Sequence, residues 1–271
     1  MFNFTINQNR RMNTLPYISH TVLMIEPVAF GYNPETSVNN YFMHEDKTPG
    51  SIIQKQALTE FREMVQMLTD KGIEVIVVKD TQEPHTPDSI FPNNWISFHL
   101  NGKVAVYPMY APNRRAERRG DIIKLVRDKG FKVIEISDYT KYEQEKKFLE
   151  GTGSMVLDRK NKTAYASISE RTDQDLFTVF CRDYGYAPVT FKAYQTHQQQ
   201  RLPIYHTNVM MQVADHYAVI CLSCIDDPVD KEIILSSLKK NEKEIIEITE
   251  SQMHQFAGNV LQLANKQGEK F

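Results

Sequence analysis

Three short polar segments carry the residue types that could do chemistry together. They are residues 87–95, with Asp88, Asn93 and Asn94, residues 148–153, with Glu150, and residues 205–208, with His206. Each segment lies at the end of an apolar, strand-like run, where side chains from separate structural units can converge on one pocket. A carboxylate, an imidazole and amides in such a pocket could hold a planar, nitrogen-rich group and move its protons.

The chemistry of Glu150 and His206 follows from their residue types and neighbours. Histidine has a near-neutral reference pKa, so His206 could protonate a leaving amine and then deprotonate water. Glu150 precedes Gly151, so its backbone can approach a ligand closely while its carboxylate accepts N–H donors or orients His206. On the residues alone, an exposed turn glutamate and a hydrogen-bonded core histidine remain open as structural alternatives.

Short strands and amphipathic helices alternate along the chain and must position these side chains. A strand at 22–25, a helix at 51–71 ending at Gly72 and a strand at 75–78 come first. A hairpin, a helix and a strand then recur three times. The first copy has strands 96–100 and 104–107, a helix near 114–128 and strand 132–136. The second has strands 154–157 and 163–166, helix 172–184 and strand 187–192, and the third has strands 209–213 and 217–222, a helix from Pro228 and strand 243–248. Each polar segment directly precedes a hairpin, and this regular placement predicts that the polar side chains converge on one central opening.

Length and composition favour one large domain, or two fused halves, over several independent modules. We take residues 1–271 as a single α/β domain that binds a small molecule. The chain is 41% hydrophobic and 24% charged, enough to bury a full core, and its net charge of -2 gives no reason to expect nucleic acid or a membrane as partner. The apolar runs are too short to span a bilayer, the start lacks a secretion signal, and three cysteines fit a reducing compartment, so we expect a cytoplasmic protein. Without a phosphate loop, dinucleotide fingerprint or metal-ligand pair, we expect no cofactor and no metal.

Four segments resemble a known superfamily. FPNNW, APNRRAERR, FLEGTGSMVLDR and PIYHTNVMM are similar to the guanidino-group-modifying enzymes: arginine deiminases, dimethylarginine hydrolases and amidinotransferases. The chain looks most similar to bacterial citrulline-utilisation hydrolases, over residues 23–262. The resemblance implies a five-bladed α/β propeller of ββαβ units, here with the last unit cut short. It also implies attack of a cysteine thiolate on a guanidinium or ureido carbon, with histidine as acid and base.

The resemblance extends to the residues expected to bind substrate. Many relatives have aspartate where Asn94 stands, and an amide favours a neutral ureido group, which points to citrulline or to an arginine hydrolysis that passes through citrulline. Asn93 is the alternative amide, and Asp88 could hold another substrate nitrogen or simply form a turn. Asn39 lies in a segment that resembles a substrate-lining loop. Asn208 stands where relatives can carry an acidic residue that contacts a substrate nitrogen, so its uncharged amide also favours a neutral substrate group.

The run at 113–119 contains four arginines that could bind a substrate α-carboxylate. A guanidinium offers a fork-shaped pair of donors to a carboxylate. Arg115 and Arg118 are the expected substrate arginines, and the others in the run would form a solvated helix start with internal ion pairs.

The cysteines supply no convincing nucleophile. The family nucleophile lies in a glycine-rich segment near the C-terminus, and no matching segment occurs in this sequence. Cys181 reads as an apolar helix residue, and Cys221 with Cys224 forms an isolated Cys-x-x-Cys that predicts neither zinc nor redox chemistry. Three explanations are open: the sequence lacks a cleaved or truncated tail, the protein is a shortened and inactive relative, or Cys221 or Cys224 has taken over the attack. We favour the first.

We therefore expect a hydrolase that acts on the ureido or guanidino carbon of citrulline or arginine. If the chain is complete as given, we expect no cysteine-dependent turnover. The alternatives are a silent binder of a guanidino or ureido amino acid, or an amidinotransferase. A homodimer is left open.

Overall fold

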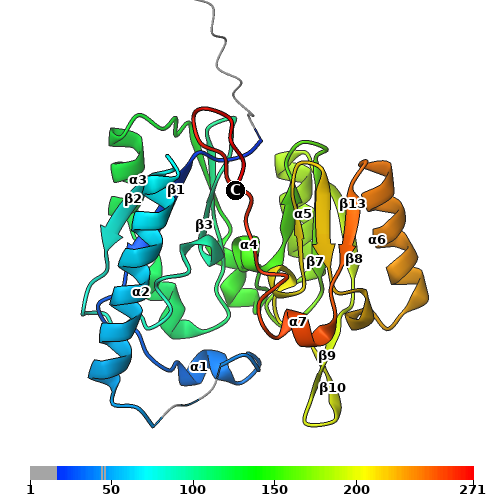
Figure 1. The fold of residues 1–271 in the computed structure, drawn as a ribbon, viewed down its shortest axis with the longest axis horizontal. Helices are drawn as coiled ribbons and strands as arrows, with labels where there is room; N and C mark the ends of the chain where they lie inside the picture. Colours follow the sequence, from blue (N-terminus) through cyan, green and yellow to red (C-terminus); the bar gives the residue numbers. More distant parts are fainter. Residues whose placement is uncertain (1–16, 44, 46) are drawn as a thin grey trace, which may run out of the picture.

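The computed structural model, which describes residues 17–43, 45 and 47–271, has a mixed α/β fold (Figure 1). Three times, an antiparallel hairpin is followed by a helix and by a strand that pairs in parallel with the second hairpin strand. The units are β3 (Ile96–Phe98), β4 (Lys103–Val106), α3 (Gly120–Asp128) and β5 (Glu135–Asp138); β6 (Val156–Asp158), β7 (Thr163–Ser167), α5 (Gln174–Tyr184) and β8 (Ala187–Phe191); and β11 (Met211–Val213), β12 (Tyr217–Ile220), α6 (Pro228–Lys240) and β13 (Glu244–Glu247). The repeat predicted from sequence is confirmed.

Residues from both ends of the described chain lie side by side. Strands β1 (Thr21–Glu26) and β2 (Glu74–Lys79) pair in parallel and are joined by α1 (Pro34–Ser37) and the long helix α2 (Gly50–Asp70). Leu263 forms a parallel bridge with Ser19, and the Ala264 N–H donates to the Ser19 carbonyl at 3.0 Å. Figure 1 shows this C-terminal segment, in red, next to β1.

Short elements connect the units. They are the 3-10 helices η1 (Pro92–Asn94), η2 (Pro112–Glu117), η3 (Thr140–Glu145), η4 (Thr207–Val209) and η5 (Leu222–Cys224), the helices α4 (Gly151–Ser154) and α7 (Glu250–Met253), and the hairpin of β9 (Tyr194–His197) and β10 (Gln200–Pro203). Among them, η1, α4 and η4 each directly precede the first strand of a ββαβ unit.

Helix α5 shows how the sequence forms and buries these helices. The Asp173 carboxylate accepts the Leu176 N–H at 2.8 Å and caps the start, while Gly185 ends the helix at a φ of 69°. Its apolar residues recur at helical spacing and are all buried: Leu176, Phe177, Phe180, Cys181 and Tyr184. They pack with Ala164 and Ala166 of β7 in one hydrophobic cluster that also contains Ala105 and Tyr107 of the preceding unit, so this core is shared between neighbouring units.

The helix predicted near 114–128 is divided, and this expectation was wrong. Residues 112–117 form η2, and α3 begins only at Gly120. Arg118 and Arg119 between them have extended backbones, with ψ of 106° and 115°. Their side chains reach in different directions: Arg118 binds Glu143, and Arg119 binds Asp121 and the Lys79 carbonyl. These contacts hold the chain open between the two helices.

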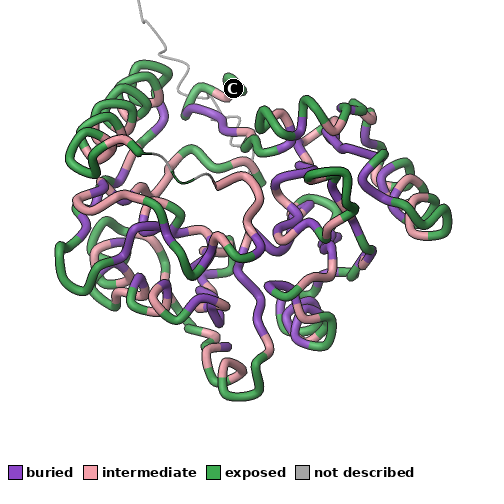
Figure 2. The backbone as a smooth tube through the Cα atoms, turned by 90° about the horizontal axis from the view of Figure 1, so that it is seen from below, coloured by how far each residue is buried: buried purple, intermediate pink, exposed green. Residues whose placement is uncertain are grey.

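Buried positions lie between the outer helices, whose outward faces are exposed (Figure 2). Helix α2 is the extreme case, with no buried residue along its 21 positions. Among the described residues, none of the helices combines the length and the hydropathy that a membrane crossing requires.

Candidate active site

The three polar segments meet at α4. Asn94 ends η1, Glu150 is the residue before α4, and His206 is the residue before η4. Helix α4 packs against both η1 and η4. The chain therefore brings together three side chains that lie at least 56 positions apart in sequence, as the position of each segment before its hairpin predicts.

Glu150 and His206 form a buried hydrogen-bonded pair. His206 Nε2 lies 2.7 Å from Glu150 Oε2, and the two residues are 5% and 0% exposed. The other carboxylate oxygen of Glu150 accepts the backbone N–H of Tyr110 at 2.9 Å. Both oxygens of the carboxylate are thus held in place, and the imidazole is oriented by the carboxylate.

Their environment sets the protonation states of this pair. Burial lowers the pKa of His206 to about 4, although the hydrogen bond to Glu150 opposes the shift. Burial would raise the pKa of Glu150, but Arg171, His206 and Arg114 together outweigh it and leave that pKa well below its usual range. At neutral pH the pair is an ionised glutamate and an uncharged histidine, which can accept a proton.

Gly153 lets the Asn94 amide and the His206 ring approach each other. A Cβ at position 153 would lie 2.5 Å from Asn94 Nδ2 and 2.7 Å from His206 Cε1. Any other residue would have to push these groups away. Gly151, at a φ of +46°, is similarly tight, since its Cβ would lie 2.2 Å from the Asn93 carbonyl oxygen.

Arg114 orients Asn94 from behind. Its Nη1 donates to Asn94 Oδ1 at 2.8 Å, so the NH₂ end of the amide faces Gly153 and His206. The guanidinium also binds Glu117 through two hydrogen bonds, of 2.8 and 2.9 Å. Arg114 is 3% exposed, and these contacts satisfy a charge that would otherwise be costly to bury.

Arg171 is a second buried guanidinium next to the pair. Its Nη1 lies 3.5 Å from Glu150 Oε2, and its other nitrogens donate to the Thr36 carbonyl and to Asn39 Oδ1. The guanidinium carbon lies 4.8 Å from the ring centre of Tyr205. Sequence reasoning missed Arg171, because Ser-Glu-Arg-Thr reads as an ordinary polar turn and no local signal marks the arginine as buried.

Buried hydroxyl groups tie the three segments together. Ser154 Oγ accepts the Glu150 N–H at 2.8 Å and donates to the Arg171 carbonyl at 2.6 Å. Thr207 Oγ1 donates to the Ser154 carbonyl at 2.5 Å. The backbones that carry Glu150, Arg171 and His206 are therefore linked, which fixes the geometry of the pair.

Residues 33–39 contact the edge of this cluster: Asn33 and Thr36 bind Asp88, and Asn39 binds Arg171. Asp88 Oδ2 accepts from Asn33 Nδ2 at 2.7 Å and from Thr36 Oγ1 at 3.1 Å, and lies 3.8 Å from Arg114 Nε. Asn39 accepts from Arg171 and donates to Glu170 at 2.9 Å. Both sequence-predicted residues lie at the edge of the Glu150–His206 cluster, each in contact with one of its two arginines.

Comparison with known proteins identifies the family. The family model for "N,N dimethylarginine dimethylhydrolase, eukaryotic" matches residues 26–271, nearly the whole chain. The chain belongs to this family. No curated protein matches it.

Solved structures share the fold at low identity. Apo ArgZ, an arginine dihydrolase from the ornithine-ammonia cycle in cyanobacteria, is 18% identical over 88% of this chain, with a TM-score of 0.64. The chain spans 33% of ArgZ and 79% of its N-terminal domain, which was solved with substrate at a TM-score of 0.63. An adduct of a dimethylarginine dimethylaminohydrolase with S-methyl-L-thiocitrulline covers 93% of this chain and 83% of its own, at 12% identity and a TM-score of 0.56.

In this dimethylarginine dimethylhydrolase family member, the predicted amides Asn208, Asn93 and Asn94 lie differently relative to the Glu150–His206 pair. Asn208, two residues after His206, has a buried Oδ1 without a hydrogen-bond partner among the described residues. This oxygen therefore lacks the hydrogen bond that a buried polar atom usually has. Asn93 meets Gly151 through its backbone carbonyl, whereas Asn94 contacts the cluster through its side chain, so Asn94 is the amide that faces the pair.

Arg115 and Arg118, the two arginines expected to bind substrate, lie outside the Glu150–His206 cluster. Arg115 lies 3.4 Å from Glu143 and donates to the Met109 carbonyl, and Arg118 forms an ion pair with Glu143. The reason lies in η2, because residues three apart eclipse in a 3-10 helix. Arg114 and Glu117 therefore share one side, and Arg115 and Arg118 share another.

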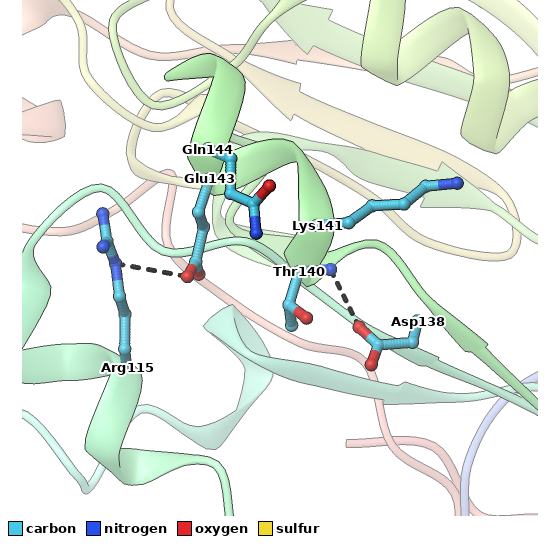
Figure 3. A pocket seen from close by; sticks show the side chains of 6 residues that line it. All are labelled: Arg115, Asp138, Thr140, Lys141, Glu143 and Gln144. Carbon is cyan, nitrogen blue, oxygen red and sulfur yellow. Dashed lines mark hydrogen bonds and ion pairs between the residues drawn. The ribbon is translucent and has the colours of Figure 1, made fainter.

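Figure 3 shows the cavity on that other side. Its lining residues are Arg115, Asp138, Thr140, Lys141, Glu143 and Gln144. It has no residue in common with the Glu150–His206 cluster.

The cysteines also lie in other parts of the fold. Cys181 is in α5, where burial raises its pKa to about 12. Cys221 directly precedes η5 and Cys224 ends it, both in the core around the third ββαβ unit. Across residues 17–43, 45 and 47–271, no group of three or more His, Cys, Asp or Glu side chains could hold a metal ion.

Proposed function

We propose that this chain carries the binding and acid–base part of a hydrolase site for a guanidino or ureido group. The observation that carries the proposal is the buried Glu150–His206 pair, 2.7 Å apart, with the Asn94 amide converging on it at Gly153. Membership of the dimethylarginine dimethylhydrolase family supports the same chemistry.

The proposed chemistry follows from the protonation states. Glu150 is ionised and accepts N–H donors from the planar substrate group, which holds the reacting carbon in place. Neutral His206 takes the proton of the attacking nucleophile. As the bond from nucleophile to carbon forms and the C–N bond breaks, His206 passes that proton to the leaving amine. Water then attacks the same carbon while His206 takes its proton, the bond from carbon to the nucleophile breaks, and the proton returns to the nucleophile.

Asn94 favours a neutral ureido group, as in citrulline. Its NH₂ end faces the cluster because Arg114 occupies the carbonyl end, so it can donate to a ureido oxygen but cannot neutralise a guanidinium. Asn208, whose Oδ1 has no partner among the described residues, is the further uncharged contact in this proposal, whereas Asn39 holds the Arg171 guanidinium. A two-step hydrolysis of arginine through citrulline fits the same site, and a structural neighbour is described as an arginine dihydrolase.

The substrate α-carboxylate is assigned in this proposal to the buried arginines. Arg171 is the stronger candidate, since its Nη1 has only the 3.5 Å contact to Glu150. Arg114 is committed to Glu117 and Asn94. Arg115 and Arg118 are committed to Glu143.

A catalytically silent binding protein is the second candidate. It is favoured by the positions of the three cysteines, which all lie outside the Glu150–His206 cluster in the described part of the chain. Turnover separates the two candidates. Incubation with citrulline or arginine, followed by analysis for ornithine, ammonia and citrulline, gives product for a hydrolase and none for a binder.

Calorimetric titration with citrulline, arginine and ornithine tests the site itself. We expect Glu150→Gln to weaken citrulline binding roughly 10- to 100-fold, because hydrogen bonds to a charged partner contribute about 1.5–3 kcal/mol. Glu143→Gln is the matched control, since Glu143 is also paired with arginines but lies outside the cluster. Equal affinity in both variants would refute the proposed site.

The five-bladed propeller and the single domain over 1–271 belong to the same proposal. Three complete ββαβ units and the pair β1–β2 support it, as does the bridge from Ser19 to Leu263, which joins the two ends of the described chain.

A further inference from the structure

The Cys-x-x-Cys segment at the end of β12 brings two thiols into direct contact. Cys221 and Cys224 are both free and buried, and their sulfur atoms lie 3.1 Å apart. The sequence alone gave no reason to expect redox chemistry from an isolated pair. The turn that carries the two residues changes that expectation.

The backbone of this turn is suited to a disulfide. The Cys224 N–H donates to the Cys221 carbonyl at 3.2 Å, which closes an i to i+3 turn. Such turns hold the two Cα atoms within about 7 Å, and disulfides join Cα atoms about 4.4–6.8 Å apart. The sulfur atoms need to approach by only about 1 Å to reach the S–S bond length of about 2.05 Å.

The two thiols are chemically unequal. The Cys224 thiol donates to the Cys221 sulfur, which lowers the pKa of Cys221 to about 7 and raises the pKa of Cys224. Burial opposes the first shift, and a contact with Ser223 Oγ at 3.3 Å supports it. Cys221 itself is buried, and the Ser223 that its sulfur contacts is an exposed residue.

We propose that Cys221 and Cys224 form a reversible thiol–disulfide site that reacts with low-molecular-weight disulfides. The Cys221 thiolate attacks one sulfur of the disulfide RSSR and displaces RS⁻, giving a mixed disulfide. The Cys224 thiol then loses its proton and attacks the Cys221 sulfur, and the second RS⁻ leaves. Both thiolates are protonated, so the net reaction converts two protein thiols and RSSR into one protein disulfide and two RSH.

Oxidised glutathione is the probe for this site. The folded chain is incubated with it, the remaining thiols are blocked with N-ethylmaleimide, and the cysteines are assigned by mass spectrometry of peptides. We expect two of the three thiols to be lost, with an internal disulfide linking Cys221 and Cys224. Cys181 stays reduced because it is buried alone in α5. Dithiothreitol should restore all three thiols.

Variants of each cysteine separate the steps. Cys224→Ser should stop at a mixed disulfide on Cys221, and Cys221→Ser should lose fast reaction altogether. Cys181→Ala is the control and should form the disulfide as readily as the parent chain. The proposal is overturned if the folded parent forms no internal disulfide, or if Cys181 reacts as fast as Cys221. Both of these outcomes are measured on the parent chain, so the test remains decisive even if a variant misfolds.

Discussion

At the residue scale, Glu150 and His206 depend on each other for their protonation states. Burial lowers the pKa of His206, and the ionised Glu150 partly offsets that decrease. Arg171 and Arg114 in turn keep the pKa of Glu150 low, so that Glu150 stays ionised. The neutral ring of such a pair can accept a proton from a reacting group and pass it to a leaving group.

Replacing Glu150 should therefore change the titration of His206. In Glu150→Gln, the carboxylate that favours the protonated ring is gone and the two buried arginines remain, so the pKa of His206 should fall below its value of about 4. The NMR shift of the His206 Cε1 proton, followed between neutral and acid pH, measures this. An increase in the pKa of His206 would show that burial and the arginines do not control it.

Burial of neutral His206 should also make the fold sensitive to acid. The unfolded chain binds a proton at His206 near the ordinary histidine pKa of 6.5, whereas the folded chain binds it only near pH 4, so stability falls as the pH falls between these values. His206→Asn removes this dependence. From pH 6.5 to 4.5, the parent should lose about 2 kcal/mol more unfolding free energy than the variant. Urea unfolding at several pH values is the measurement, and parallel pH profiles would contradict the expectation.

At the element scale, α4 is the contact point at which η1 and η4 meet. Its glycines allow this, because the backbone of one segment lies where a side chain of another would be. The 3-10 geometry of η2 has a comparable effect, since it places Arg114 and Glu117 on the same side.

Gly153→Ala should damage the site, whereas Gly120→Ala should not. The new methyl group at 153 would lie 2.5 Å from Asn94 Nδ2, and overpacking of this kind costs about 1–3 kcal/mol. At Gly120, the start of α3, nothing lies within 4 Å, so alanine should be neutral or stabilising by up to about 1 kcal/mol. Denaturant unfolding and citrulline calorimetry on both variants test this. Equal stability and affinity would mean that the close approach at 153 is unimportant.

At the scale of the whole molecule, a buried ion pair joins two neighbouring units. Lys243, just before β13, donates to the Ala214 and Asp215 carbonyls at 2.9 Å each and lies 3.1 Å from Asp158 at the end of β6. Both side chains are almost fully buried. A charge in this position is tolerated only while its partner remains.

Lys243→Met should destabilise the protein by about 3–5 kcal/mol, because it leaves the Asp158 carboxylate buried without its cation. The double variant with Asp158→Leu should recover much of that loss. Lys160→Met is the control: its pair with Asp215 is half exposed, so the cost should stay within about 1 kcal/mol. Thermal and denaturant unfolding measure all three, and equal losses for Lys243→Met and Lys160→Met would show that this ion pair does not stabilise the contact between the units.

The sequence predicted the repeated units well because their signals are local. Apolar alternation, helical spacing and turn residues such as Asn101 and Gly102 lie close together along the chain and act over a few residues. The helix expected near 114–128 was wrong because the break at Arg118 and Arg119 depends on partners outside the segment, including Glu143.

From the sequence alone, the order of strands and helices and the placement of Asn94, Glu150 and His206 before their hairpins were determined, since hydrophobic periodicity and turn chemistry are written in neighbouring residues. The folded chain was needed to show that Arg114 and Arg171 border the cluster and that Cys221 touches Cys224. The physical reason is that these distances depend on side-chain direction and on how α4, η1 and η4 pack, and neither is encoded in spacing along the chain.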